Sequence, residues 1–171
     1  AAERAGSGGL LMQGAVIRPA RPEDVPLLDA ALQALSADLG DSHRATPAGL
    51  LAAGYGEVPA FRALLALDGQ DVVGAAVFSP LYSTTRGHPG AYVSDLWVAG
   101  AARGAGLGPR LLAAVRDEAR RLWGAGFLRL AVYSGNPRAV AFYERLGFAA
   151  RTGEVGMILE GAALDRIGGD A

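Results

Sequence analysis

A short glycine-rich segment between two regular patterns constrains the fold of this chain more than any other feature. The segment reads Ala101-Ala-Arg-Gly-Ala-Gly-Leu-Gly-Pro-Arg110. An apolar run at 92–98, typical of a strand, precedes it, and an amphipathic run at 111–123, typical of a helix, follows it. Glycines permit a tight turn with exposed backbone N–H groups, and a helix start adds unpaired donors and partial positive charge. The unit is therefore predicted to bind an anion, most often a pyrophosphate.

The spacing of the glycines narrows the choice of phosphate ligand. Dinucleotide folds use Gly-x-Gly-x-x-Gly early in the chain, and a nucleotide P-loop ends in Gly-Lys-Ser/Thr where this chain has Pro109-Arg110. The pattern Arg103-x-x-Gly106-x-Gly108 after a strand resembles instead the coenzyme A loop of the GCN5-related N-acetyltransferases. The alternative is a plain turn, because the chain has 25 glycines among 171 residues.

Composition excludes several classes of protein. Hydrophobic residues make up 51% and charged residues 19% of one domain-sized chain, which indicates a globular protein. No apolar run reaches the roughly 18 residues of a membrane helix. A net charge of −1 disfavours a broad nucleic-acid surface, and the lack of cysteine excludes disulfides, thiolate zinc sites and a cysteine nucleophile. We expect a cytoplasmic protein that binds neither membrane nor nucleic acid.

The remaining patterns predict alternating strands and helices. Residues 1–14 are expected to be a flexible arm or a cloning remnant, 15–160 the folded domain, and 161–171 a frayed tail. The expected strands are 15–19, the hairpin 60–67 with 71–79, the parallel pair 92–98 and 127–132, and a terminal hairpin from 148 that includes 154–159. The expected helices are 21–39, 48–55, 111–123 and 138–146, and residues 80–90 are expected to form a polar loop.

A second motif follows the glycine turn by about thirty residues. It reads Asn136-Pro-Arg-Ala-Val-Ala-Phe-Tyr-Glu-Arg-Leu-Gly-Phe148. An Asn-x-x-Ala-x-x-Phe-Tyr-x-x-x-Gly-Phe pattern occurs at this place in the same acetyltransferases. Two motifs in the right order are far more specific than one. From about residue 15 to residue 159, the chain is therefore identified as resembling the GCN5-related N-acetyltransferase (GNAT) superfamily.

The resemblance implies an α/β (α+β) fold and a cosubstrate, acetyl-CoA. The fold would be a single domain with a mixed sheet of about six to seven strands, helices on both faces, and a cleft where the two parallel strands splay apart. The pantetheine arm would pair with the backbone of the first strand, the pyrophosphate would bind the glycine turn, and an asparagine would bond the pantetheine chain. The implied cofactor-binding residues are Leu96, Trp97, Val98, Arg103, Gly104, Ala105, Gly106, Leu107, Gly108, Pro109, Asn136 and Tyr143.

The chemistry implied is direct attack of an amine on the thioester. In similar enzymes the helix tyrosine, here Tyr143, protonates the departing thiolate. The alternative for Tyr143 is a core aromatic, because it shares a helical stripe with Phe142 and Leu146. No metal is expected, because His43 and His88 do not have the spacing of metal ligands.

The acceptor amine is less well defined. The run from Tyr82 to Val98 resembles the diamine and polyamine acetyltransferase branch, but Ser94-Asp95 replaces the usual Glu-Asp pair. Asp95 and Ser94 are the candidate catalytic residues beside the tyrosine, although strand alternation predicts that they point to opposite faces. The candidate substrate-binding residues are Asp41, His43, Tyr82 and Tyr92, while Asp38 and Glu57 are more typical of solvated charges.

These observations predict an N-acetyltransferase that acts on a primary amine of a small molecule, of polyamine, amino-acid or aminoglycoside type. One alternative is acetylation of a protein N-terminus or lysine. Another is a coenzyme A-binding module without turnover, which the missing strand glutamate keeps open. The resemblance also implies a homodimer.

Overall fold

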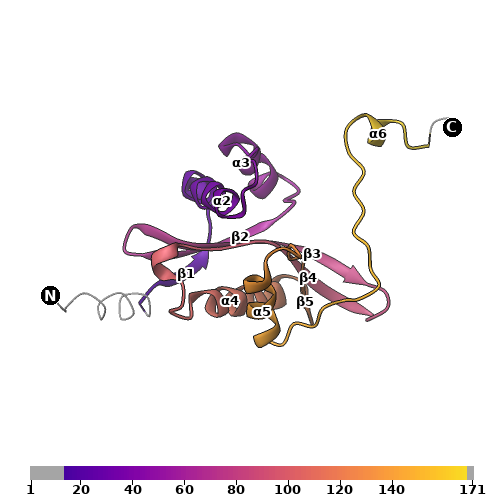
Figure 1. Cartoon of the computed structure of the whole chain (residues 1–171). Helices are drawn as coiled ribbons and strands as arrows, with labels where there is room; N and C mark the ends of the chain where they lie inside the picture. The colour runs from indigo at the N-terminus through magenta and orange to yellow at the C-terminus, as the bar shows by residue number, and fades with distance from the viewer. Residues whose placement is uncertain (1–13, 169–171) are drawn as a thin grey trace. The chain divides into compact units, whose positions relative to one another are not determined.

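The computed structural model describes residues 14–168, which fall into two compact units (Figure 1). One unit extends to Ala131 and the other begins at Val132, and each is described by itself. Nearly all of the expected N-terminal arm, residues 1–14, lies outside the described residues. The elements of the first unit are β1 (Val16–Pro19), η1 (Pro22–Asp24), α2 (Val25–Leu39), α3 (Pro47–Tyr55), β2 (Arg62–Asp68), β3 (Asp71–Ser83), β4 (His88–Val98), η2 (Gly100–Ala102), α4 (Leu107–Trp123) and β5 (Leu128–Leu130).

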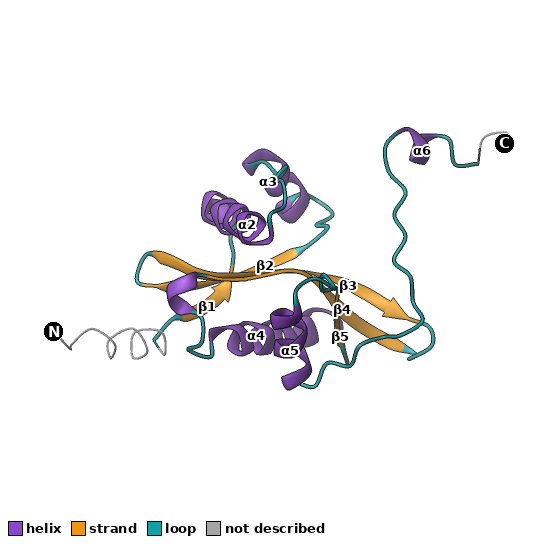
Figure 2. Ribbon diagram, in the orientation of Figure 1, coloured by secondary structure: helices purple, strands orange, loops and turns teal. Residues whose placement is uncertain are grey.

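The first unit is built on a mixed sheet with the strand order β1-β2-β3-β4-β5. Its first four strands are antiparallel neighbours, whereas β4 and β5 are parallel because α4 connects them. Helices α2 and α3 cover one face of the sheet and α4 covers the other (Figure 2). The expected α/β class is confirmed, with five strands in the described residues rather than six or seven.

The third and fourth strands are longer than the sequence predicted. Residues 80–90, expected to be a loop, continue the β3–β4 ladder from Pro80 opposite Ala91 to Ser83 opposite His88. Only residues 84–87 turn the chain, and Gly87 adopts a φ of 72° there. The outer half of this hairpin is largely exposed to water, so polar residues occur on both of its faces. The alternation of apolar and polar residues that marks a half-buried strand is therefore missing from the sequence.

Helix α4 is fixed to the sheet by one apolar stripe. Leu107, Leu111 and Val115 are at most 1% exposed, and they recur at the spacing that places side chains on one helix face. Complete burial of a leucine contributes about 1.5–3 kcal/mol, so this stripe holds the start of the helix firmly against the sheet. The helix ends at Trp123 and is capped by Gly124, which adopts a left-handed conformation.

An ion pair between half-buried Arg18 and buried Asp24 ties β1 to the first helical turn. The guanidinium of Arg18 donates two hydrogen bonds to the carboxylate of Asp24, from Nη1 over 2.5 Å and from Nη2 over 2.8 Å. The backbone N–H of Arg21 donates a third, over 2.8 Å. These bonds, above all those from Arg18, lower the pKa of Asp24 to about 2 although burial opposes the shift. Asp24 is therefore a structural carboxylate outside the candidate site.

The second unit carries α5 (Pro137–Arg145) and the four-residue α6 (Ala162–Asp165). The sequence prediction of a terminal hairpin after residue 148 is wrong for this structure. Residues 154–159 form no strand within the described part of the chain. The side chains of Val155, Met157 and Ile158 are 83–93% exposed. An apolar run supplies β propensity, but a strand forms only where a partner edge completes its hydrogen bonds.

Candidate active site

A β-bulge in β4 is the local feature that builds the site. Val77 of β3 lies opposite Asp95, whereas the next residue, Phe78, lies opposite Val93. Ser94 is therefore an extra residue on β4, and the alternation of side chains breaks at this position. The bulge lies at the point where β4 passes beyond its short neighbour β5, which pairs only with Ala91, Tyr92 and Val93.

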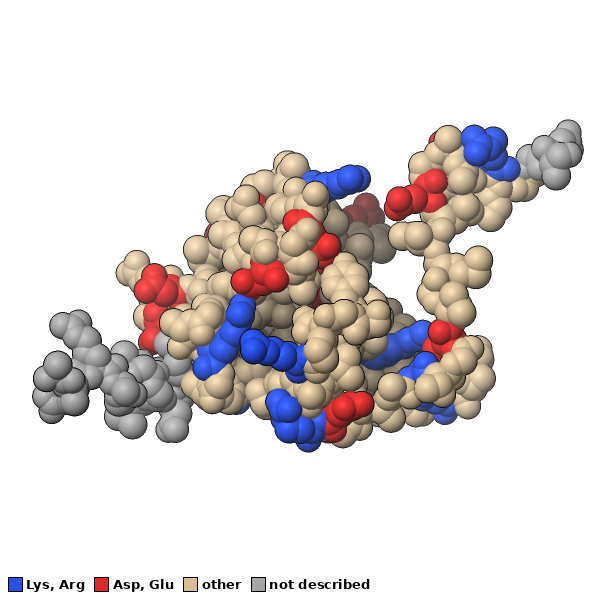
Figure 3. Space-filling view, in the orientation of Figure 1, with Lys and Arg blue, Asp and Glu red and all other residues tan. Residues whose placement is uncertain are grey.

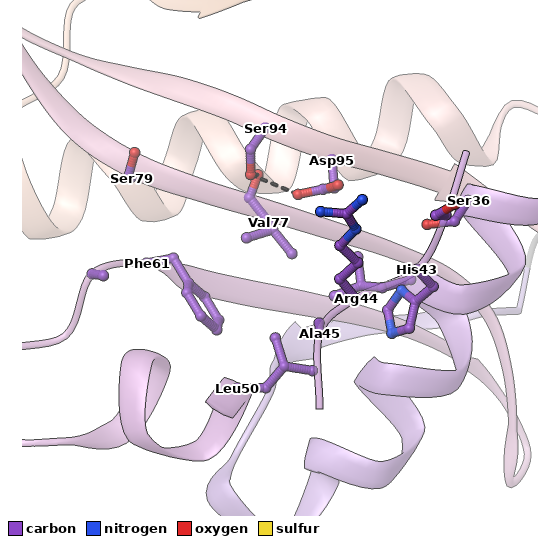
Figure 4. A pocket seen from close by; sticks show the side chains of 13 residues that line it. Ser36, His43, Arg44, Ala45, Leu50, Phe61, Val77, Ser79, Ser94 and Asp95 are labelled. Carbon is purple, nitrogen blue, oxygen red and sulfur yellow. Dashed lines mark hydrogen bonds between the residues drawn. The ribbon is translucent and has the colours of Figure 1, made fainter. Parts of the chain in front are cut away.

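The bulge contributes two polar side chains to a pocket of about 420 Å³ (Figure 4). Strand alternation predicted that Ser94 and Asp95 point to opposite faces, but both line this pocket. Ser94 Oγ donates a hydrogen bond to Asp95 Oδ2 over 2.7 Å, and it also lies 3.3 Å from the carbonyl oxygen of Val77. The lining comes from α2, the loop after it, α3, the loop before β2, β3 and β4: Leu32, Ser36, Ser42, His43, Arg44, Ala45, Leu50, Ala60, Phe61, Val77, Ser79, Ser94 and Asp95.

The loop between α2 and α3 supplies the remaining ionisable side chains of the pocket. His43 lines it, and its Nε2 lies 3.0 Å from Oδ1 of Asp29 on α2. Arg44 also lines the pocket, and its side chain extends toward Asp95 (Figure 4). Sequence reasoning found His43 but missed Arg44 and Asp29. A loop arginine next to a candidate histidine was the available signal, whereas the contact with Asp29 depends on how α2 packs.

The other candidate substrate residues lie outside the pocket lining. Tyr82 is an exposed residue of β3 and pairs with Pro89. Tyr92 lies between Ser79 and Arg129 in the sheet register. Asp41 follows the end of α2, where its backbone N–H bonds to Ser36 O. Of the four, the structure places only His43 with Ser94 and Asp95.

The end of β4 presents an open backbone edge. On its β3 side, residues 96–98 pair with Ala76, Ala75 and Gly74. On the opposite side no described strand pairs with them, since β5 ends its ladder at Val93. The carbonyl oxygen of Val98 accepts a hydrogen bond from Arg103 Nε over 2.9 Å. Leu96, Trp97 and Val98 thus form an edge that an extended ligand can pair with.

The glycine turn joins this edge to α4. Gly104 and Gly106 adopt φ values of 80° and 79°, which disfavour other residues, and Gly106 is the N-cap of α4. A Cβ atom at either glycine would meet nothing within 4 Å, so the turn is open on that side. Gly108 and Pro109 lie in the first helical turn, where backbone N–H groups lack intrahelical partners, although Pro109 itself has no N–H to offer. The Leu107 side chain is buried. These residues fit a pyrophosphate.

Asp38 holds the arginine of the glycine turn, Arg103, in place. Its Oδ2 accepts hydrogen bonds from Arg103 Nη2 and from Trp97 Nε1, the latter over 3.2 Å. This carboxylate, regarded as a solvated charge or a possible amine ligand in the sequence, instead connects the end of α2 to β4 and to the loop after it. Arg103 is therefore oriented by Asp38 on one side and Val98 on the other.

In the second unit, Asn136 and Tyr143 belong to one short helix. Asn136 is the N-cap of α5, and its Oδ1 accepts a hydrogen bond from the Ala139 N–H over 3.1 Å. The ring of Tyr143 makes edge contacts with Phe142 and Phe148, with centroid distances of 5.0 and 5.5 Å. Burial raises the pKa of Tyr143 above its usual value, so the phenol stays protonated at neutral pH.

Comparison with known families decides what this arrangement belongs to. The profile of the acetyltransferase (GNAT) family matches residues 28–148, which is most of the chain and includes the bulge, the glycine turn and α5. The chain belongs to the acetyltransferase (GNAT) family. It is an acyl-CoA-dependent acetyltransferase, and the resemblance inferred from the two motifs is confirmed.

Relatives of this acetyltransferase include enzymes named for a small amine. The chain is 33% identical to the thialysine N-epsilon-acetyltransferase of Mus musculus, over 70% of this chain and 76% of that protein. It is also 33% identical to the Bos taurus protein of the same name, over 64% of this chain and 68% of that protein.

Solved structures show the same fold. An aminoglycoside acetyltransferase from a soil metagenome, in complex with sisomicin, has a TM-score of 0.72 and 17% identity over 86% of this chain and 97% of its own. An integron cassette protein from Vibrio cholerae has a TM-score of 0.74 and 20% identity over 91% of this chain and 98% of its own.

One face of this GNAT acetyltransferase carries both basic and acidic side chains (Figure 3). Figure 3 shows basic and acidic side chains interspersed on the face in view, as short-range ion pairs such as Arg121–Glu118 lead one to expect. Within residues 14–168 there is no cluster of three or more side chains suited to a metal ion. No helix in that range is both long and apolar enough to cross a membrane.

Proposed function

We propose that this enzyme transfers the acetyl group of acetyl-CoA to a primary amine of a small molecule. The observation that carries the proposal is the Ser94–Asp95 pair in a pocket at the point where β4 becomes an open edge. A carboxylate at that point attracts an ammonium group toward the end of β4, where acetyl-CoA would bind. The names of the thialysine and aminoglycoside relatives support a small amine as the acceptor.

Binding of acetyl-CoA would use the open edge and the turn. The backbone of Leu96, Trp97 and Val98 would pair with the pantetheine arm, and Asn136 would donate from its amide nitrogen, since its Oδ1 caps α5. The N–H groups from Gly104 to Gly108 would bind the pyrophosphate, with Arg103 adding charge-assisted bonds. When bound, acetyl-CoA supplies the acetyl group and a thiolate leaving group.

The side chains of the enzyme would move two protons. Asp95 accepts a proton from the acceptor ammonium, directly or through Ser94, because an ammonium has no lone pair for attack. The new bond joins the amine nitrogen to the acetyl carbonyl carbon while the carbon–sulfur bond breaks. A backbone N–H near Val98 stabilises the charge on the acetyl oxygen. Tyr143 then gives its phenolic proton to the sulfur, and its raised pKa keeps that proton available. The attacking nitrogen loses its second proton after the new bond has formed, and this proton restores the phenol of Tyr143.

Release of free coenzyme A thiol, measured against a panel of amines, tests the proposal. The protein has no cysteine, so a thiol reagent reports only the product. The panel contains amino acids with side-chain amines, diamines, an aminoglycoside and a peptide with a free N-terminus. Turnover with a small amine supports the proposal. Turnover with the peptide alone would favour a protein acceptor, and tight acetyl-CoA binding without any turnover would favour a binding module.

Two properties follow from the sequence rather than from this geometry. We retain a homodimer as a proposal, which sedimentation of the purified chain tests directly. We also retain a cytoplasmic location as a proposal, which fractionation of the source cells tests.

A further inference from the structure

The acceptor pocket contains one cation and one anion that do not neutralise each other. Arg44 and Asp95 both line it, and in Figure 4 the guanidinium extends toward the carboxylate. No ion pair joins the two, and within residues 14–168 neither has another ion-pair partner. Other arginines of the chain are paired, as in Arg18–Asp24 and Arg103–Asp38. One ligand can bridge two unpaired opposite charges in a cavity if it carries a cationic group for the carboxylate and an anionic group for the guanidinium.

We infer that the acceptor is an amino acid, with its reactive amine at Asp95 and its carboxylate at Arg44. A guanidinium matches a carboxylate with two parallel N–H donors, which gives orientation as well as affinity. The amine end meets the only carboxylate among the lining residues of the described chain. The inference rests on the proposed function and specifies its substrate class.

The rest of the lining suits the carbon chain between those two groups. Leu50, Phe61 and Val77 form an apolar side of the pocket (Figure 4). Ser36, Ser42 and Ser79 add uncharged polar groups that tolerate a second amine. A cavity of about 420 Å³ lies within the usual size range of small-molecule sites.

The same charges disfavour a polyamine. A diamine or polyamine is cationic at both ends, so a molecule anchored at Asp95 would bring its second ammonium toward Arg44. Like charges in a partly desolvated pocket repel, and Arg44 cannot lose its proton to relieve this. A pocket built for polyamines requires carboxylates at both ends, whereas this lining has a single carboxylate and an arginine. Within the branch that the sequence resembles, the charges of this pocket therefore favour an amino acid over a diamine or polyamine as the acceptor.

The decisive comparison uses three acceptors with the same reactive amine. L-lysine has the α-carboxylate, lysinamide has a neutral amide in its place, and cadaverine lacks the group. We expect kcat/KM to be about tenfold or more higher for lysine than for either of the others, mainly through a lower KM. Equal or higher values for cadaverine would overturn the inference while leaving the acetyltransferase proposal intact.

Variants at Arg44 give a signal that misfolding cannot imitate. Arg44→Gln is expected to lower kcat/KM for lysine about tenfold. Its kcat/KM for lysinamide should stay within about twofold of the wild-type value. Arg44→Glu is expected to lower kcat/KM for lysine further and to raise kcat/KM for cadaverine. Together these changes would reverse the preference between the two acceptors. Arg120→Gln, an exposed arginine of α4 outside the pocket, should keep the wild-type preference. An unchanged preference in Arg44→Glu would overturn the inference.

Calorimetric titration separates failure of this inference from failure of the proposed function. The three acceptors are titrated into the full-length wild type and into the Arg44→Glu variant. This binding measurement does not depend on acetyl transfer. If no amine is turned over but lysine binds the wild type more tightly than cadaverine, and Arg44→Glu reverses the order, the pocket assignment stands and the catalytic proposal fails. If lysine shows no advantage in binding or turnover, the assignment is wrong.

Discussion

Ser94 and Asp95 are consecutive residues of a strand, yet their side chains meet in one pocket and share a hydrogen bond of 2.7 Å. The bulge opposite Val77 and Phe78 makes this possible, because it gives β4 one more residue than β3 at that point. The serine hydroxyl thereby orients the Asp95 carboxylate just beyond the part of β4 that pairs with β5. This relationship supports the role that we propose for Asp95.

Removal of the Asp95 charge should impair proton transfer. We expect Asp95→Asn to lower kcat/KM about 100-fold near pH 7, because the acceptor amine is then almost entirely protonated and loses its base. The loss should shrink above about pH 10, where the free amine is abundant. Ser94→Ala should cost less, about three- to tenfold, since it removes only the orienting bond.

Rates across pH with a fixed saturating acetyl-CoA concentration measure these effects. Asp117→Asn serves as the control, because Asp117 pairs with Arg116 on the exposed side of α4. If Asp95→Asn behaves like Asp117→Asn, Asp95 has no part in proton transfer.

Replacement of the α5 phenol should separate chemistry from binding. We expect Tyr143→Phe to lower kcat about 100-fold with little change in the Kd for coenzyme A, because the ring keeps its contacts with Phe142 and Phe148. Because burial raises the pKa of Tyr143, the wild-type kcat should show no decline from loss of this proton below about pH 10. Single-turnover rates and calorimetry measure the two quantities, and full turnover in Tyr143→Phe would remove it from the mechanism.

The two left-handed glycines that flank α4 provide a matched test of the phosphate turn. Gly106 is the N-cap and Gly124 the C-cap, with φ values of 79° and 66°, and both have open space where a Cβ would lie. Valine at either position strains the backbone by roughly 1–2 kcal/mol. Only Gly106→Val should also abolish coenzyme A binding, because its side chain blocks approach to the N–H groups of the turn. Equal coenzyme A affinities in the two variants would contradict the assignment.

The Arg18–Asp24 pair should contribute to stability in a pH-dependent way. The pKa of Asp24 falls from 3.8 to about 2 on folding, so its carboxylate stabilises the folded chain by about 2 kcal/mol above pH 4. This contribution should disappear as the pH falls from about 4 to about 2, because the folded state then binds the proton as well. We expect Asp24→Asn to lower the free energy of unfolding accordingly at pH 7.

Urea titration at pH 7 and at pH 2.5 measures this difference. Glu23→Gln is the control, because Glu23 is 67% exposed and lies 3.8 Å from Arg21, and such surface pairs contribute little. A gap between wild type and Asp24→Asn that stays the same at both pH values would show that the ion pair is not its source.

Local sequence was sufficient for much of the fold and for the glycine turn before α4. The glycines around residue 106 require a left-handed backbone, and Thr46-Pro47 and Asn136-Pro137 carry the capping chemistry with which α3 and α5 begin. These signals act over a few residues, so neighbours in the chain are enough to read them. The β2–β3 hairpin around Gly69 was predicted for the same reason.

The sequence by itself thus determined the order of the main strands and helices up to α5, the glycine turn before α4 and the acetyltransferase family. Tertiary structure alone decided which polar side chains share a pocket. The bulge at Ser94 depends on the register with β3. The packing of α2 and its loop on the sheet places His43 and Arg44 in the pocket with Asp95, and it brings Asp29 to His43. Residues 154–159 have the composition of a strand but form none in this structure. The physical reason is common to all of these cases: backbone propensity acts over a few residues, whereas register, strand pairing and charge proximity depend on groups far apart in the chain.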